Sequence, residues 1–204
     1  AAAVPAEPVA EGSVGAGTGT VCFGWKGGIG TSSRCLPAGQ GGYTLGVLVQ
    51  ANYGGLLQIM GVPVGQKLRQ ESGKAIDQEG SIMIVLATDA PLSDRNLKRL
   101  AWRSFAGLAR SGSSFGNSSG DYAIAFSTAA GVRRTSLSNA LLSSISDLPN
   151  KLLSPLFQAA IEATEEAIYN ALFMATSITG YEGHTVPALP LSRVMLLLDK
   201  SLTA

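Results

Sequence analysis

The chain has 204 residues, which is enough for one domain with a sizeable core and too few for several independent units. Its 15 Lys and Arg residues against 14 Asp and Glu residues give a formal net charge of +1, which provides no basic surface for nucleic acid or for an anionic membrane. Only 14% of the residues are charged and 25 are glycine, so we expect buried strands, tight turns and further burial between copies in a homo-oligomer.

In chain order, the first 19 residues are rich in Ala, Pro and Gly and predict a linker or extended arm. Neither an initiating Met nor a signal-peptide pattern is present, so we expect the sequence to begin inside a longer precursor. A short strand is predicted over residues 20–25, between glycine turns. Residues 43–52 and 58–64 predict two strands joined as a hairpin by Gly54 and Gly55.

The middle of the chain changes character at residue 80. Residues 65–80 are polar, charged in both signs and without an apolar period, which predicts an exposed loop. Residues 81–88, SIMIVLAT, form an apolar run rich in β-branched residues, as is typical of a fully buried strand. Residues 91–108 then carry apolar side chains at helical spacing, with Ser93 or Asp94 as the N-cap.

The last 80 residues predict one more strand and two helices. The strand covers residues 121–128, a helix begins near Pro155 and ends near residue 174, and a short helix covers residues 192–202. The three acidic residues of the longer helix are expected to face solvent: Glu162, Glu165 and Glu166. The pattern of strands and helices predicts a layered α/β domain.

The residues that usually carry chemistry are scarce. Cys22 and Cys35 leave two alternatives open, one disulfide or two reduced, buried thiols. His184 is the single histidine, so a multi-histidine metal site is excluded, and any Ser-His-Asp mechanism would depend on one residue in the loop 180–187. The glycine run at residues 15–19 does not meet the dinucleotide fingerprint, and no Walker loop occurs. We expect neither a metal nor a cofactor.

A nucleophile can nevertheless work without histidine if it is the first residue of a chain. Cleavage between Gly80 and Ser81 would place a free α-amino group beside the Ser81 hydroxyl, and an N-terminal amine can serve as the nucleophile's base. The pKa of a free α-amino group is about 8, close to the working pH. The flexible polar loop before the bond and the buried strand after it suit such a cut, although Gly-Ser before an apolar strand also occurs by chance.

Five segments together resemble the DmpA-type family of self-processing L-aminopeptidase/D-amidase-esterases, which includes the β-peptidyl aminopeptidases. The resemblance covers most of residues 12–130, and the last 70 or so residues are compatible but less distinctive. The segments are GSVGAGTGTVCFGWKGGIGTSSR (12–34), GGYTLGVLVQANYG (41–54), GVPVG (61–65), GSIMIVLATDAPLSDRNLKRLAWRSFAGLARSGS (80–113) and GNSSGDYAIAFSTA (116–129).

The resemblance implies a role for four residues. Precursors of the family cut themselves at a Gly-Ser bond that aligns with Gly80 and Ser81, so Ser81 would be the nucleophile and, through its amine, the base. The asparagine of the Q-A-N motif falls on Asn52 and would help to hold the oxyanion. In the S-G-[ED] motif, Ser119 would bond to the nucleophile region and Asp121 would pair with the amine, where some members carry Glu. Without the resemblance, Asn52 fits a turn residue equally well, and Ser119 and Asp121 are better explained as turn residues at the start of a strand.

The resemblance also implies the fold, a four-layer αββα sandwich of the N-terminal-nucleophile hydrolase type shared with ornithine acetyltransferase. Residues 1–80, with the processing loop 65–80, would be the C-terminal part of the α fragment, and residues 81–204 would be the β fragment of the same domain. Family precursors have a further N-terminal region with a catalytic-site tyrosine, to which no position here corresponds. The missing N-terminal part is therefore an expected partner of this chain.

The implied activity is release of N-terminal residues from small peptides, amides or esters by acyl transfer through Ser81. A β-peptidyl aminopeptidase with the same residues is the alternative, and a non-catalytic homologue is the rival from another class. Ornithine acetyltransferases use a threonine nucleophile, which ranks acyl transfer to an amino acid below hydrolysis. We expect a cytoplasmic location, with the periplasm left open, and neither nucleic acid nor membrane as a partner.

Overall fold

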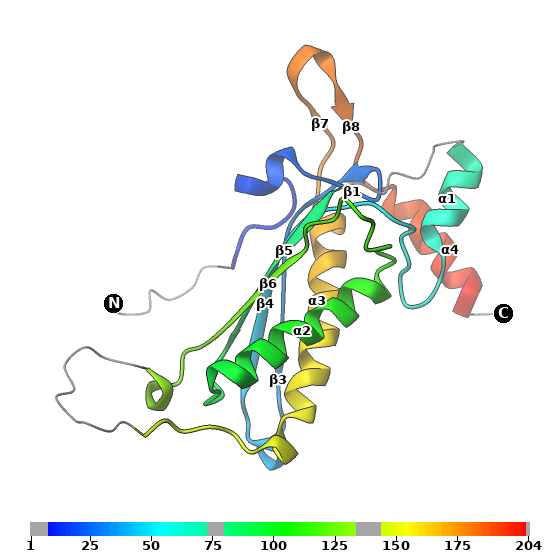
Figure 1. Cartoon of the computed structure of the whole chain (residues 1–204). Coiled ribbons are helices and arrows are strands. Elements are labelled where there is room, and N and C mark those ends of the chain that lie inside the picture. The colour runs from blue at the N-terminus through cyan, green and yellow to red at the C-terminus, as the bar shows by residue number, and fades with distance from the viewer. Residues whose placement is uncertain (1–7, 73–79, 134–143, 203–204) are drawn as a thin grey trace.

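A computed structural model of the chain describes residues 8–72, 80–133 and 144–202. Its centre is a four-stranded sheet in the order β3-β4-β5-β6, formed by Gly28–Cys35, Thr44–Asn52, Ser81–Thr88 and Tyr122–Ser127 (Figure 1). The pairs β3-β4 and β4-β5 are antiparallel, and β5-β6 is parallel. The parallel pair needs a crossover, which helix α2 (Asp94–Arg110) provides.

Helices cover one face of this sheet. Helix α3 (Ser154–Phe173) packs on β3 and β4, and α2 packs on β6 and on α3 (Figure 1). The buried face of α3 is largely alanine, which lets the helix approach its neighbours closely. Strand residues alternate accordingly, and the side chains that face the helices form the core: Leu45, Val47, Val49, Ala51, Ile82, Ile84 and Leu86.

The opposite face of the sheet, here called the outer sheet face, has no covering layer among the described residues. Met83 is 40% exposed, Tyr122 63%, Ile124 56% and Phe126 45%, and the strand register places them on the same side. Exposed apolar area of this kind marks an interaction surface in most folded proteins. The described residues thus supply two layers, one helical and one sheet, of the predicted four.

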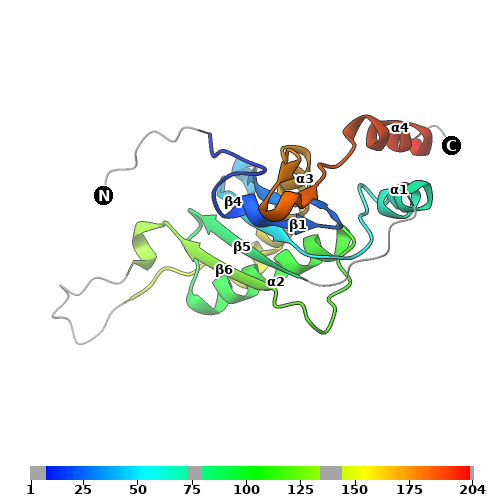
Figure 2. The ribbon, with the colours of Figure 1, turned by 90° about the horizontal axis from the view of Figure 1, so that it is seen from above.

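The remaining elements lie around the sheet. Helices α1 (Val64–Ser72) and α4 (Leu191–Leu202) lie together beyond one end of it, and the two views agree on this position (Figures 1 and 2). The hairpin of β7 (Ile178–Thr179) and β8 (Thr185–Val186) projects from the body (Figure 1). No helix in the described ranges is long and apolar enough to cross a membrane.

Several predicted elements are present. The strands over 81–88 and 121–128 correspond to β5 and β6, and the helix after Pro155 corresponds to α3. The helix predicted over 91–108 is α2, with Ser93 as the N-cap that accepts a hydrogen bond from the amide of Asn96 (3.4 Å). The short final helix is α4.

Other predictions are wrong. Residues 58–64 form turns rather than a strand, and β4 pairs instead with β3, a strand that the sequence did not predict. The strand predicted over 20–25 is a small hairpin of β1 (Val21–Cys22) and β2 (Trp25–Lys26). The first 19 residues were predicted to form an extended arm, but from Gly12 onward they pack against β3. The backbone of Gly12 forms hydrogen bonds with that of Ile29.

One expectation about an exposed segment is wrong, and another holds in part. The loop predicted over 65–80 begins with α1, in which Val64 and Leu68 are buried; residues 73–79 lie outside the described part. Glu162 and Glu166 of α3 are 42% and 46% exposed and bind Arg34, whereas Glu165 is 18% exposed and binds Arg110. These pairs fasten α3 to β3 and to α2.

Candidate active site

The two strands at the centre of the sheet bring Ser81 and Asn52 together. Ser81 is the first residue of β5 and pairs directly with Asn52, the last residue of β4. Directly paired residues of antiparallel strands point to the same face, with their Cβ atoms about 5 Å apart. Because the alternating pattern buries Ile82 and Ala51 under the helices, Ser81 and Asn52 lie on the outer sheet face.

Gly80, which precedes the nucleophile candidate, occupies a position that only glycine fits. Its φ is +113°, a conformation that side-chain-bearing residues rarely adopt. A Cβ on residue 80 would lie 2.2 Å from the carbonyl oxygen of Asn52. The fold therefore requires glycine at position 80 for steric reasons, in addition to the chemical role of the Gly-Ser bond inferred from sequence.

The loop before β6 completes the group, because the parallel pairing of β5 and β6 places its end beside Ser81. The backbone N–H of Gly120 donates to the Ser81 Oγ at 2.8 Å. The Ser119 hydroxyl donates to Asp121 Oδ1 at 2.9 Å, and the backbone N–H of Ile82 donates to the same oxygen at 3.2 Å. One carboxylate oxygen thus fixes both the loop and the start of β5.

All four residues predicted from the sequence meet at this point, but their contacts differ from those expected. Ser119 bonds to Asp121 rather than to Ser81, and Asp121 contacts the nitrogen of Ile82, one residue after Ser81. The group that donates to the Ser81 hydroxyl is the backbone N–H of Gly120. Sequence reasoning missed Gly120, although it is the central residue of the S-G-D motif.

Asn52 is held by a neighbouring strand. Its Oδ1 accepts the backbone N–H of Val21 at 2.9 Å, and its Nδ2 makes no hydrogen bond to the described part of the chain. An amide whose oxygen is fixed in this way presents its NH2 group in one direction. The arrangement leaves two donor hydrogens for a ligand near Ser81.

Two buried aromatic rings and one buried thiol lie close to Asn52. Tyr53 and Cys22 are fully buried, and the ring of Phe23 meets that of Tyr53 edge to face at 4.9 Å. Burial raises the pKa of the Cys22 thiol to about 12, and burial also raises the pKa of Tyr53. Both groups are neutral at working pH.

Cys22 and Cys35 are free thiols, so the predicted disulfide is wrong. Cys35 is exposed, so the alternative of two buried thiols holds only for Cys22.

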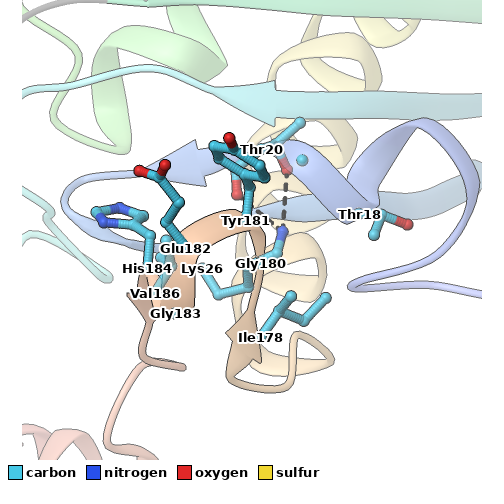
Figure 3. A pocket seen from close by; sticks show the side chains of 11 residues that line it. Thr18, Thr20, Lys26, Ile178, Gly180, Tyr181, Glu182, Gly183, His184 and Val186 are labelled. Atoms are coloured by element: carbon cyan, nitrogen blue, oxygen red, sulfur yellow. Dashed lines mark hydrogen bonds between the residues drawn. The ribbon is translucent and has the colours of Figure 1, made fainter.

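Two cavities lie in this region. One of about 390 Å³ borders Ser119 and Asp121 and is lined by Trp102, Phe105 and Phe115. A larger one, of about 580 Å³, lies between the β7-β8 hairpin and the loop before β1, and Figure 3 shows His184, Tyr181 and Lys26 around it. No member of the Ser81 group lines the larger cavity, so His184 is separate from the candidate nucleophile.

The Ser81 group offers a hydroxyl, an amide donor, a carboxylate and backbone N–H groups for chemistry. Across residues 8–72, 80–133 and 144–202, no group of three His, Cys, Asp or Glu side chains is placed to hold a metal ion.

These features place a serine directly after a glycine, at the start of a central strand of an α/β sheet. Solved structures share this fold. The PH0078 protein from Pyrococcus horikoshii OT3 has a TM-score of 0.85 with 43% identity, over 95% of this chain and 53% of that one. The L-aminopeptidase D-Ala-esterase/amidase from Ochrobactrum anthropi, described as a variant of the Ntn hydrolase fold, has a TM-score of 0.84 with 40% identity, over 95% and 53%.

The chain belongs to peptidase family S58, whose sequence profile matches residues 1–186. It is 42% identical over 212 aligned residues to the β-peptidyl aminopeptidase BapA of Sphingosinicella microcystinivorans, covering 95% of this chain and 52% of the relative. The BapA of Sphingosinicella xenopeptidilytica is 40% identical, covering 92% and 51%. The chain thus spans about half the length of the relatives it matches.

Proposed function

We propose that the chain is part of a self-processing serine aminopeptidase/amidase whose nucleophile is Ser81. The observation that carries this proposal is the convergence of four groups from three separate segments around Ser81. These are the paired Asn52, the Gly120 N–H, Asp121 and the close-packed Gly80. The names of the family and of its relatives, which are aminopeptidases, support the same reading.

Self-cleavage would begin at the peptide bond between Gly80 and Ser81. The Ser81 Oγ attacks the carbonyl carbon of Gly80, the C–N bond breaks, and the nitrogen of Ser81 takes up the proton that Oγ releases. Water then hydrolyses the resulting ester, which leaves a Gly80 carboxylate and a free Ser81 amine. The Gly120 N–H binds Oγ as a donor, so the hydroxyl hydrogen stays available for transfer.

Turnover would repeat this acyl transfer on a substrate. The Ser81 amine accepts the Oγ proton as Oγ attacks the carbonyl after the substrate's N-terminal residue, and it then returns the proton to the leaving amine. The Asn52 NH2 group would donate to the developing oxyanion. Water, deprotonated by the same amine, finally releases the acyl group from Ser81. Asp121, close to the start of β5, would stabilise the ammonium form between these steps.

The proposed function also requires a further layer of structure over the outer sheet face. We propose that the N-terminal part of a longer precursor packs there as the second sheet of an αββα sandwich, since the relatives are about twice as long as this chain. The small substrate would then bind between the two sheets at the Ser81 end. We further propose a homo-oligomer in the cytoplasm; native mass and cell fractionation test these two points.

The central test is the Ser81→Ala variant of the full-length protein. We expect it to remain one uncut chain and to have no aminopeptidase activity, because both the nucleophile and the cleavage step are lost. Denatured mass and N-terminal sequencing should give a fragment that begins at Ser81 in the wild type only. Ser113→Ala, which changes a serine outside the site, is the matched control and should be cut and active. A cut and active Ser81→Ala protein would disprove the proposal.

The type of N-terminal residue is a separate question. Two relatives are named β-peptidyl aminopeptidases, and one structural neighbour is named an L-aminopeptidase, so both kinds of substrate are candidates. The kcat/KM values for an L-alanyl and a β-homoalanyl p-nitroanilide would decide between them. The catalytic residues are the same in both cases, so the difference would lie in the pocket that holds the amine.

A further inference from the structure

Lys26 is a buried cation that the reaction proposed above does not use. It is the last residue of β2, and its side chain is 1% exposed. Its ammonium donates three hydrogen bonds to backbone oxygens, those of Gly17 (2.6 Å), Thr20 (2.8 Å) and Gly27 (2.9 Å). Figure 3 shows the side chain directed at Thr20.

The bond to Thr20 matters because of what lies on the other side of the same peptide unit. The carbonyl of Thr20 and the N–H of Val21 belong to one planar amide and point in opposite directions. Lys26 binds the oxygen, and the N–H donates to Asn52 Oδ1 at 2.9 Å. A continuous line of hydrogen bonds therefore runs from the Lys26 ammonium through one peptide unit to the Asn52 amide.

Each step of this line has a defined effect on the next. A cation on the carbonyl oxygen polarises the peptide unit and makes its N–H a stronger donor. The stronger N–H holds and polarises the Asn52 amide, whose NH2 hydrogens become more positive in turn. The same ammonium also fixes the loop through the Gly17 oxygen, and the Thr20 oxygen accepts a second bond from the Gly27 N–H at 3.1 Å. The peptide unit therefore has little freedom to turn.

We propose that Lys26 is a positioning residue for acyl transfer, which acts through the Thr20-Val21 peptide to fix and polarise the Asn52 amide toward the oxyanion. This inference rests on the proposed function, because it assigns Lys26 a part in stabilising the oxyanion of that reaction. It predicts an effect of Lys26 on kcat that exists only while Asn52 is present.

A double-mutant cycle in the full-length protein tests this dependence. Removing one oxyanion donor typically costs a factor of about 10² to 10³ in kcat, which we expect for Asn52→Ala. Lys26→Met keeps the aliphatic stem without the charge, and we expect a loss of about tenfold in kcat with KM almost unchanged. The double variant should be no slower than Asn52→Ala alone. Lys151→Met, at an exposed lysine, is the control and should match the wild type.

All rates are to be expressed per molecule with a free Ser81 terminus, counted by denatured mass, so that reduced self-cleavage is not mistaken for reduced kcat. If Lys26→Met has full kcat, or if its loss persists undiminished in the Asn52→Ala background, the inference is overturned while the proposed function stands. If Asn52→Ala itself has full kcat, the oxyanion role of Asn52 fails, and the inference fails with it.

A second variant covers the case in which Lys26→Met does not fold. Replacing Val21 by its α-hydroxy acid changes the Thr20-Val21 amide to an ester, which removes the N–H but leaves the Lys26 side chain in place. We expect a loss in kcat similar to that of Lys26→Met, because the line is broken one bond further on. A folded, processed ester variant with the wild-type kcat would contradict the inference.

Discussion

At the scale of single residues, the backbone contributes as much to the site as the side chains. The hydrogen bond to the Ser81 hydroxyl comes from the Gly120 N–H, and the Asn52 amide is fixed by the Val21 N–H. Backbone groups are placed by the strands and do not depend on rotamers, so they hold the reacting atoms rigidly. A side-chain substitution at these positions, other than proline, leaves such a group in place.

The position before Ser81 gives a residue-scale prediction. Gly80→Ala introduces a Cβ that would lie 2.2 Å from the Asn52 carbonyl oxygen, at a φ of +113°, so the peptide bond proposed to be cut must shift. We expect the full-length variant to accumulate as an uncut chain, because a displacement of about 1 Å can slow a reaction about 10²-fold. Denatured mass after expression gives the uncut fraction.

The control for this variant separates backbone strain from displacement. Gly61 also has a positive φ, +78°, but no atom lies within 4 Å of a Cβ built there. Gly61→Ala should therefore lose about 1 to 2 kcal/mol of stability and still be cut normally. Equal cleavage of both variants would show that the close approach of Gly80 to Asn52 is irrelevant to processing.

At the scale of elements, polar contacts join segments that the sequence keeps far apart. Asp147 accepts hydrogen bonds from the Ser93 amide and hydroxyl and from the Asn96 side chain, all at the start of α2. Desolvation alone would raise the pKa of Asp147, but the bonds from Ser93 and Asn96 outweigh it and lower the pKa. The carboxylate form thus stabilises the link between α2 and the segment before α3.

This shift gives a pH prediction with a definite sign. A carboxyl whose pKa is lower in the folded state contributes stability above its ordinary pKa of about 3.9, and the contribution is lost as the pH falls through the lower, folded value. We therefore expect the Tm of the wild type to fall more steeply than that of Asp147→Asn between about pH 5 and the folded pKa. Parallel Tm curves for the two proteins would refute a role for this carboxylate.

The elements that the sequence predicted are those with a strong local pattern. The apolar run of β5 and the stripe and cap of α2 were readable directly, whereas β3 was missed because Gly, Ser and Thr fill it. Gly30 in β3 is required by α3, since a Cβ there would lie 1.9 Å from the carbonyl oxygen of Ala167. Such a constraint comes from a helix more than 130 positions away and has no local signal.

The same division applies to the site. A glycine-serine pair before an apolar strand suggested the nucleophile, but the roles of Asn52, Ser119 and Asp121 came from resemblance to a family. These residues meet because β4 pairs with β5 and β5 with β6. The predicted hairpin, which paired residues 43–52 with 58–64, would not have brought them together. The Gly120 and Val21 N–H groups carry no side-chain signal at all.

At the scale of the whole molecule, the outer sheet face stands out because it leaves large apolar side chains exposed. Its exposed side chains, Met83, Tyr122, Ile124 and Phe126, are apolar or aromatic and come from adjacent strands. A sheet buried on both faces normally has apolar residues on both, and this sheet has them. The proposed αββα sandwich requires an apolar outer sheet face of this kind, because its second sheet would cover the face.

Substitution on this face distinguishes a covered surface from a free one. Ile124 is 56% exposed here, so Ile124→Asp would be almost neutral if nothing covered it. Under the proposed packing, the full-length variant buries an unpaired carboxylate and should lose several kcal/mol of stability or fail to fold.

The control is Met60→Asp, at a 74% exposed side chain in a loop with a φ of +52°, which aspartate tolerates. This variant should keep the wild-type stability in urea unfolding. If both variants are equally neutral, the second sheet does not lie on this face.

The position of β4 has a consequence for the molecule after processing. β4 would belong to the first fragment and β5 to the second, yet the two strands are joined by eight residue pairs at the centre of one sheet. Severing the 80–81 bond would thus leave a non-covalent heterodimer with the architecture of a single chain. Its unfolding would become a dissociation, so its melting temperature would rise with protein concentration, whereas that of the uncut precursor would not. Dilution would leave the precursor intact, but it would let the two fragments of the cut enzyme dissociate and lose activity slowly.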